Sequence, residues 1–291
     1  MRSSDFSPSP PRAKRPPSSP LSEAPPSTEV ITSAANPAIA LVRSLARRDR
    51  RAAEGAFVVE GRRAVHDALL TGALPRLLLV RQDEPESWRD LPLSAAVQAR
   101  VVERRLFDRL SDVQTPQGIL AVFPFPSVAL ALDDPAPLAL VIDRLRDPGN
   151  LGTLLRSAAA AGVNAVYLSP ETVDPWNPKV VRAGMGAHFR VPLVTLGVET
   201  LDELRQRLPR RVVASAAAAR PYDASDWTGA AALVIGGEAE GVGPELEAWG
   251  TEEVGIPLDH GVESLNAAVA GAVILFEAAR QRRLARAVRA V

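Results

Sequence analysis

The second half of the chain alternates between short, continuous apolar runs and longer amphipathic segments. The run at residues 138–142 contains no polar position, which is typical of a parallel strand covered on both faces. Amphipathic patterns separate such runs and predict helices, for example at 151–161 and 201–208. The alternation predicts an α/β fold with helices on both faces of a mostly parallel sheet. The further apolar runs lie at residues 165–168, 191–196, 211–214, 231–235 and 253–256.

The first half of the chain has a mixed pattern and predicts a separate, smaller α/β unit. Four prolines between positions 124 and 137 interrupt both patterns and predict a linker. The elements predicted before this linker are a helix at 37–51, a strand at 56–59, a helix at 63–70 and a strand at 77–80. The predicted organisation is a first domain at 30–125, a linker at 126–137 and a second domain at 138–291, which ends in a long helix at 265–288.

Composition agrees with two folded domains and sets the N-terminus apart. With 46% hydrophobic residues in a chain of 291, the protein can bury a sizeable core. Residues 1–29 are instead rich in proline and serine. We predict that they form a disordered tail, because their few large apolar side chains cannot offset the entropy of ordering.

The chain has no cysteine and three histidines, which narrows the chemistry it can carry. Disulfides, thiolate zinc sites and cysteine nucleophiles are excluded, and no metal site is predicted. No apolar run approaches the roughly 20 residues of a membrane span, and the N-terminus lacks the apolar core of a signal peptide. We therefore expect a cytoplasmic protein with no membrane partner.

The loop that follows residue 142 is the first of three candidate binding loops. It leads into a predicted helix for which Asn150 is a suitable N-cap, and Arg156 follows within the first turns. A helix that begins at the carboxyl end of a parallel strand is a favourable site for an anionic ligand. A capped surface helix with a solvated arginine explains the same residues equally well.

The second loop follows the apolar run at 231–235 and contains Glu238 and four glycines, at positions 236, 237, 241 and 243. Glycines let the backbone approach a ligand closely and adopt positive φ angles. Their spacing matches neither the dinucleotide-binding pattern G-x-G-x-x-G nor a phosphate-binding P-loop. A tight turn without a ligand is the alternative.

The third loop, residues 256–266, directly precedes the terminal helix. Ser264 is a suitable N-cap for that helix, and Asn266 brings an amide donor and an acceptor to its start. A simple capping turn accounts for Ser264 but not for Asn266. Because all three loops follow predicted strands at their carboxyl ends, we expect them to form one pocket.

In order and spacing, these three loops resemble the signature motifs of the SpoU-type (TrmH-like) RNA 2′-O-ribose methyltransferases of the SPOUT superfamily. The first domain is similar to the substrate-binding domain of that family at residues 36–37, 57–61 and 115–119. The proline-rich tail lies outside the resemblance. The resemblance implies a parallel sheet with a C-terminal trefoil knot, which the residue pattern could not predict because knots are nearly absent from folds in general.

The resemblance also implies the reaction, its cofactor and the oligomeric state. A methyl group passes from S-adenosyl-L-methionine to a ribose 2′-hydroxyl of a structured RNA. The enzyme acts as a homodimer, in which the active site uses residues from both copies. By position, Gly236, Ile256 and Leu265 line the cofactor pocket, and Gly241 permits close backbone approach.

The implied catalytic residues need only to orient the acceptor and assist in removing its proton. The sulfonium methyl group is already activated, so orientation and removal of one proton supply most of the acceleration. Arg156 is implied to contact the 2′-hydroxyl or a neighbouring phosphate and to stabilise developing negative charge, because an arginine does not readily act as a base. The residues implied to position the groups around it are Asn150, Glu238, Ser264 and Asn266.

Positive charge is concentrated in the first domain, although the formal net charge of the chain is zero. Between positions 43 and 63, seven arginines and three acidic residues give a local excess of four positive charges. Arginines bind phosphates well, so we predict that this segment binds RNA, with an ordinary solvated helix face as the alternative. The candidate RNA-binding residues are Arg43, Arg47, Arg48, Arg50, Arg51 and Arg62.

The sequence favours ribosomal RNA over transfer RNA as the substrate, and three other functions stay open. One is methylation of transfer RNA. Another is a dimer that binds RNA without methylating it. The last is a nucleotide-dependent oxidoreductase on an open α/β sheet, which the glycine spacing disfavours. A methyltransferase that protects the ribosome from an antibiotic is a variant of the favoured function.

Overall fold

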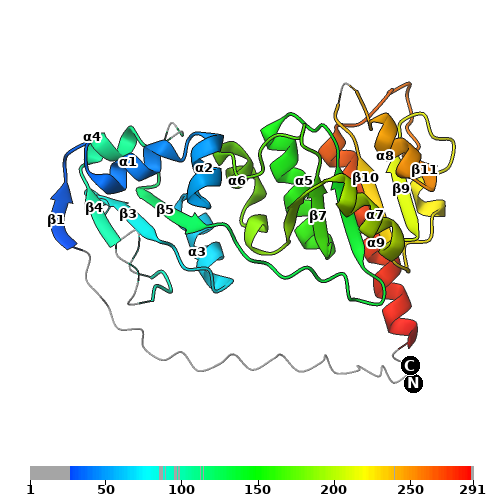
Figure 1. Cartoon of the computed structure of the whole chain (residues 1–291), viewed down its shortest axis with the longest axis horizontal. Helices are drawn as coiled ribbons and strands as arrows, with labels where there is room; N and C mark the ends of the chain where they lie inside the picture. Colours follow the sequence, from blue (N-terminus) through cyan, green and yellow to red (C-terminus); the bar gives the residue numbers. More distant parts are fainter. Residues whose placement is uncertain are drawn as a thin grey trace, which may run out of the picture.

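The computed structural model describes residues 27–84, 88, 90–94, 97, 99–111, 113, 115–238 and 240–289. Its chain forms two β-sheets, each flanked by helices (Figure 1). Strand β1, Ser27–Ile31, begins inside the predicted tail, and residues 1–26 of that tail lie outside the described residues. Within the described ranges, no helix has both the length and the apolarity needed to span a bilayer.

The first sheet is mixed, with the strand order β1-β4-β3-β5-β2. Strands β2 and β3 pair antiparallel with β5, whereas β1 and β3 pair parallel with β4. The first sheet contributes to two hydrophobic cores. Helices α1 and α4 pack into one of them, and α3 packs into the other. The bounds are β2 Ala56–Glu60, β3 Leu77–Arg81, β4 Ala99–Val102, β5 Ile119–Pro124, α1 Pro37–Ser44, α3 Arg62–Leu70 and α4 Arg104–Asp108.

The prediction of a single helix at 37–51 is wrong, because the structure has two helices in this region. Helix α1 ends at Ser44, and α2 spans Arg48–Glu54. Arg47 between them has an extended backbone, with φ −93° and ψ 137°. The break leaves carbonyl groups of Leu45 and Ala46 without helical partners, and the buried Arg51 side chain donates to both, at 2.7 and 2.8 Å.

The second sheet is entirely parallel, with the order β11-β9-β10-β6-β7-β8, so the prediction of a parallel α/β sheet is confirmed. Strand β8 is shorter than the apolar run at 191–196, since it begins after Pro192, which has no N–H to donate to the ladder. The trefoil knot stays a prediction. The bounds are β6 Leu138–Ile142, β7 Ala165–Leu168, β8 Leu193–Thr195, β9 Arg210–Ala214, β10 Ala231–Ile235 and β11 Glu252–Val254.

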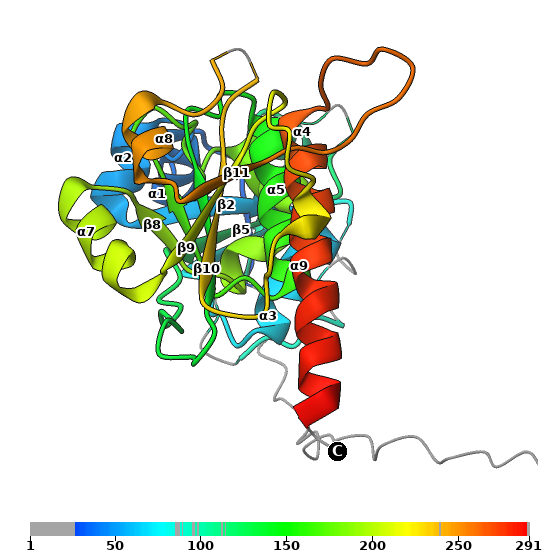
Figure 2. The same ribbon diagram turned by 90° about the vertical axis from the view of Figure 1, so that its right-hand side faces the viewer.

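Helices cover both faces of the second sheet (Figure 2). Helices α5, α6 and α9 pack on one core, and α7 and α8 pack on the other. The ends of parallel strands therefore meet at one edge of a three-layer structure, where loops can form a site. The bounds are α5 Pro148–Ala161, α6 Pro178–Gly184, α7 Val198–Arg207, α8 Pro244–Trp249 and α9 Ala267–Arg289, with short 3₁₀ helices at Ala187–Phe189 and Tyr222–Ala224.

An aromatic cluster joins the two halves of the molecule. Phe57 of β2 lies 4.8 Å from the Trp176 ring and 5.6 Å from the Phe189 ring, both of which belong to the second half. Buried His188 lies against the same rings, and its Nε2 is 2.7 Å from the Pro175 carbonyl oxygen. Burial lowers the pKa of His188 to about 4, so the ring is neutral near pH 7.

Candidate functional site

The first and second candidate loops leave the sheet side by side. Strands β6 and β10 are in register, with Ile142 opposite Ile235. Directly after β6, the buried carboxylate of Asp143 accepts a hydrogen bond of 2.7 Å from the Gly243 backbone N–H in the second loop. A buried carboxylate with a backbone donor holds these loops in a fixed relation.

Asn150 is not the N-cap of α5, contrary to the sequence prediction. The helix begins at Pro148, and the cap is Asp147, whose Oδ1 accepts a hydrogen bond of 2.7 Å from the Asn150 backbone N–H. Both residue types are good caps, but the proline fixes the first helical position directly after Asp147. The amide side chain of Asn150 is therefore available for contacts outside its own helix.

Asn150 connects all three candidate loops. Its Nδ2 donates to Oε1 of Glu238 in the second loop. Its Oδ1 accepts a hydrogen bond of 2.9 Å from Nδ2 of Asn266 at the end of the third loop. The three loops therefore meet at one place, as the sequence predicted.

Asn266, not Ser264, caps the terminal helix. Its Oδ1 accepts from the backbone N–H groups of Ala268 and Val269, at 2.9 and 3.2 Å. The N-cap predicted at Ser264 is thus wrong by two residues. Ser264 is exposed and lines a cavity instead.

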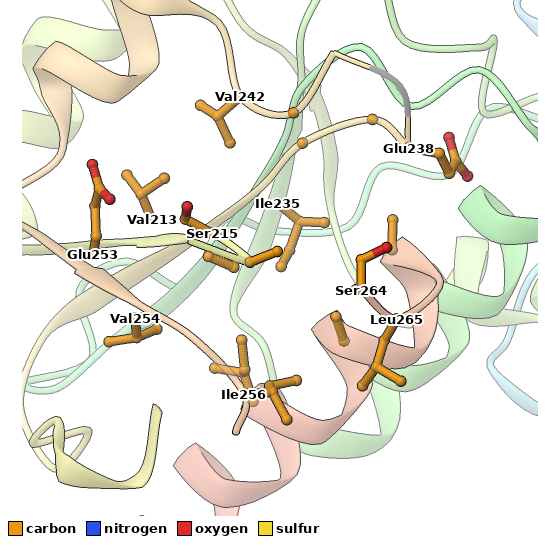
Figure 3. Close-up of a pocket in the computed structure, with 18 of the residues that line it drawn as sticks. Val213, Ser215, Ile235, Glu238, Val242, Glu253, Val254, Ile256, Ser264 and Leu265 are labelled. Atoms are coloured by element: carbon orange, nitrogen blue, oxygen red, sulfur yellow. The ribbon is translucent and has the colours of Figure 1, made fainter. Parts of the chain in front are cut away.

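A cavity of about 490 Å³ lies between the second and third loops and the end of β9 (Figure 3). Its volume is within the range of small-molecule sites. Apolar side chains of Ile235, Ile256 and Leu265 form part of its wall (Figure 3). All four residues predicted to bind the cofactor line it, namely Gly236, Gly241, Ile256 and Leu265, together with Glu238, Ser264 and Asn266.

Gly236, which lines this cavity, has no room for a side chain. A Cβ atom there would lie 2.1 Å from the carbonyl carbon of Gly241 and 2.4 Å from its oxygen. Gly241 itself has a φ of +62°, in the region that favours glycine. Gly236 is therefore required for the second loop to fold back over the end of β10, and Gly241 favours the left-handed turn within that loop.

The chemistry of the lining fits an adenosyl group better than a phosphorylated one. Apolar side chains, glycine backbone and serine hydroxyls form most of the lining. Its charged members are the glutamates Glu238, Glu247 and Glu253, and no arginine, lysine or histidine lines the cavity among the described residues. Ser215, at the end of β9, is a lining residue that the sequence analysis missed. The signal available was its position directly after a strand that precedes the glycine-rich loop.

Arg156 lies outside the cavity lining. It is exposed, and within the described part of the chain it has no hydrogen-bond or ion-pair partner. Six residues separate it from Asn150, which corresponds to about 240° around an α-helix, so the two side chains leave α5 on different faces. One copy of the chain therefore does not bring Arg156 together with the other candidate catalytic residues.

Most of the candidate RNA-binding arginines already have acidic partners. Arg47 pairs with Asp49, Arg50 with Glu54 and Arg62 with Asp90. The hydrogen bond from Arg47 lowers the pKa of Asp49. The prediction for Arg51 is wrong, because its guanidinium is buried against Asp174 and cannot reach RNA. Arg43 and Arg48 are exposed, and neither has an ion pair within the described ranges.

Comparisons with known proteins identify the family of the chain. Residues 137–276 match the model of the SpoU rRNA Methylase family, and residues 36–121 match an MRM3-like substrate binding domain. The mitochondrial rRNA methyltransferase 3 of Mus musculus is 36% identical, over 80% of this chain and 69% of that protein. The 23S rRNA (guanosine(2553)-2′-O)-methyltransferase RlmP of Bacillus subtilis is 32% identical, over 84% of this chain and 97% of that protein.

The architecture agrees with solved structures as well. An AdoMet-bound rRNA methyltransferase from Sinorhizobium meliloti superimposes with a TM-score of 0.74 at 30% identity, covering 87% of this chain and 97% of that one. The matched relatives span both sheets of the protein and the linker between them. The chain belongs to the SpoU rRNA methylase family.

Proposed function

We propose that this protein transfers a methyl group from S-adenosyl-L-methionine to a ribose 2′-hydroxyl of ribosomal RNA. The observation that carries the proposal is the bonding of Asn150 to both Glu238 and Asn266, at the mouth of a cavity of cofactor size. The relatives named above are rRNA methyltransferases, and one is named for transfer to a guanosine 2′-oxygen.

The cavity suits S-adenosyl-L-methionine in size and chemistry. Its apolar wall at Ile256 and Leu265 can hold the adenine ring, and the backbone of the second loop offers polar groups at close range because Gly236 and Gly241 have no side chains. When bound, the cofactor supplies a methyl group activated by a sulfonium sulfur. An activated donor leaves to the protein the tasks of orienting the acceptor and accepting its proton.

The site residues divide these two tasks. Transfer breaks the bond between the methyl carbon and the sulfonium sulfur, which leaves as a neutral thioether, forms a bond between that carbon and the ribose oxygen, and releases the hydroxyl proton. Among the five candidate catalytic residues, Glu238 has the only carboxylate and is the proposed proton acceptor, and Asn150 orients it. Arg156 holds phosphate or the developing alkoxide through its guanidinium.

A homodimer explains how Arg156 reaches a cavity that its own chain does not present to it. Helices α5 and α9 pack side by side (Figure 2). Both have exposed side chains on one stripe, with Thr153 and Arg156 on α5 and Val269 and Phe276 on α9. Val269 and Phe276 are 47% and 49% exposed, an apolar pair that a second copy would cover.

A single substitution tests the proposed homodimer and the position of its interface. Phe276→Glu places a charge on the proposed dimer face and is expected to give monomers in sedimentation velocity. Leu70→Glu, at another exposed apolar position, is expected to leave the dimer intact. If Phe276→Glu sediments as the unchanged protein does, α9 is not the dimer face.

The function is tested by incubating the protein with labelled S-adenosyl-L-methionine and either unmodified ribosomal RNA or unmodified transfer RNA. Label in ribosomal RNA at a linkage that resists alkali is the expected result, because 2′-O-methylation protects the adjacent phosphodiester. Label in transfer RNA alone would assign the other substrate. Cofactor binding by calorimetry with label in neither RNA would favour a binding protein over an enzyme.

A further inference from the structure

The exposed arginines of the first domain fall into two groups, those with acidic partners and those without. Arg47 and Arg50 belong to the first group, since each is paired with a carboxylate on α2. Arg43 on α1 and Arg48 at the start of α2 belong to the second group within the described ranges. An unpaired exposed guanidinium is free to bind a phosphate without first breaking an ion pair.

Helix α4 contributes two more unpaired arginines, which the sequence analysis did not single out. Arg105 and Arg109 are exposed, lie one helical turn apart and have no ion pair within the described part of the chain. The carboxylates nearest to them in sequence are already engaged. Glu103 caps α4 through a bond of 2.9 Å from the Leu106 N–H, and Asp108 contacts Arg81 and Arg104.

These arginines share one side of the first domain. Helices α1 and α4 pack into the same hydrophobic core, through Ile39 and Val42 on α1 and Leu106 and Phe107 on α4. Their outer surfaces are therefore neighbours. In Figure 1, α4, α1 and α2 lie in the upper part of the molecule, and the loop between β11 and α9 projects at its upper edge in both views (Figures 1 and 2).

Lys179 extends the unpaired charge into the second domain. The buried pair of Arg51 and Asp174 attaches α2 to the segment that leads into α6, and Lys179 lies in the first turn of that helix. Its side chain is exposed and has no ion pair among the described residues. The unpaired basic residues thus run from α4 across α2 to the catalytic domain.

We infer that Arg43, Arg48, Arg105, Arg109 and Lys179 form a phosphate-binding row that holds the backbone of the substrate RNA as it approaches the cavity. The inference rests on the proposed function, which supplies an RNA as the ligand. Five exposed cations without ion pairs attract an anion, and a polynucleotide offers phosphates at regular spacing. The row names RNA contacts that differ from most of those predicted from the sequence.

A pair of double variants tests the row. Arg105→Gln with Arg109→Gln removes two phosphate contacts and is expected to reduce the slope of log K against log salt by about two units, with weaker binding at every salt concentration. The control is Arg283→Gln with Arg286→Gln, two exposed arginines on the last turns of α9, which extend away from the upper edge (Figure 2). It removes the same charge and is expected to leave the slope unchanged.

The probe is unmodified ribosomal RNA transcribed in vitro, and binding is measured by filter retention without cofactor. Because this measurement needs no methyl transfer, it tests the row even if the proposed reaction fails. In the transfer assay, KM for RNA is expected to rise in the α4 double variant while the cofactor dissociation constant does not change. Equal slopes for the two double variants would overturn the inference, whether both are lowered or both are unchanged.

Discussion

Asn150 has a double role that depends on its amide group. It donates to Glu238 and accepts from Asn266, so both faces of the amide are used. An aspartate at this position could accept from Asn266 but could not donate, and it would place a second negative charge beside Glu238. Asn150 therefore needs an amide side chain, because it must donate to the carboxylate of Glu238 and accept from the amide of Asn266.

Arg156→Ala is expected to abolish methyl transfer while leaving cofactor affinity within about a few-fold. The physical reason is that Arg156 lies outside the cavity lining of its own chain, and in the proposed dimer its guanidinium contacts the acceptor RNA and not the cofactor. Transfer is measured with labelled cofactor, and affinity is measured by calorimetry. A parallel loss of transfer and of cofactor affinity would contradict the role proposed for this residue.

Gly236→Ala is expected to weaken cofactor binding by at least about tenfold, because the new Cβ would overlap the backbone of Gly241 and push the second loop into the cavity. Gly229→Ala is the matched control, since a Cβ at Gly229 meets no atom within 4 Å. Calorimetry on both variants checks the prediction. Normal affinity in Gly236→Ala would show that the second loop can move aside without cost.

At the scale of elements, Arg51→Ala tests how the first domain is attached to the second. Removing one partner from a buried ion pair costs about 3–5 kcal/mol, because the carboxylate of Asp174 is left buried without its cation. Arg50→Ala removes an exposed pair with Glu54 and is expected to cost less than about 1 kcal/mol. Urea unfolding measures both, and equal losses would mean that the buried pair contributes little.

The central strands β6, β7 and β10 of the second sheet were predictable because each is an uninterrupted apolar run, and burial on both faces demands that composition. The exact helix starts were not. Asp147 and Asn150 are equally good caps by residue type, and so are Ser264 and Asn266. Which one caps is decided by the proline after Asp147 and by the hydrogen bond between Asn150 and Asn266, a contact between loops far apart in the chain.

The roles of the arginines were the least predictable part of the site. The pattern of charge along residues 43–63 does not distinguish a buried guanidinium from an exposed one. Arg51 differs from Arg50 only because Asp174, in the second domain, approaches it in the folded molecule. Contacts of this kind depend on the packing of the two halves, which local sequence does not encode.

At the scale of the whole molecule, the interface between the two halves makes stability depend on pH. The pKa of His188 is lowered to about 4 by burial, from about 6.5 in the unfolded chain. The unfolded state therefore binds more protons between these two values. It follows that the contribution is complete above about pH 6.5 and is lost as the pH falls toward 4.

The expected size of this effect is about 2 kcal/mol of unfolding free energy between roughly pH 7 and pH 5. His188→Gln keeps a donor for the Pro175 carbonyl but cannot titrate, so its stability is expected to fall less over the same interval. Urea unfolding of both proteins at each pH provides the measurement. A parallel decline would assign the acid sensitivity to groups other than His188.

Arg51 and Asp174 are 123 positions apart in the chain, and this separation has a consequence while the protein is being synthesised. The ribosome releases the whole first sheet before Asp174 and Trp176 emerge. During that interval the nascent first domain holds a guanidinium without its carboxylate and Phe57 without the rings of Trp176 and Phe189, so its folding is completed only as the second domain forms. A chain that stops at residue 125 stays in this state and presents to chaperones the surface that the complete protein hides.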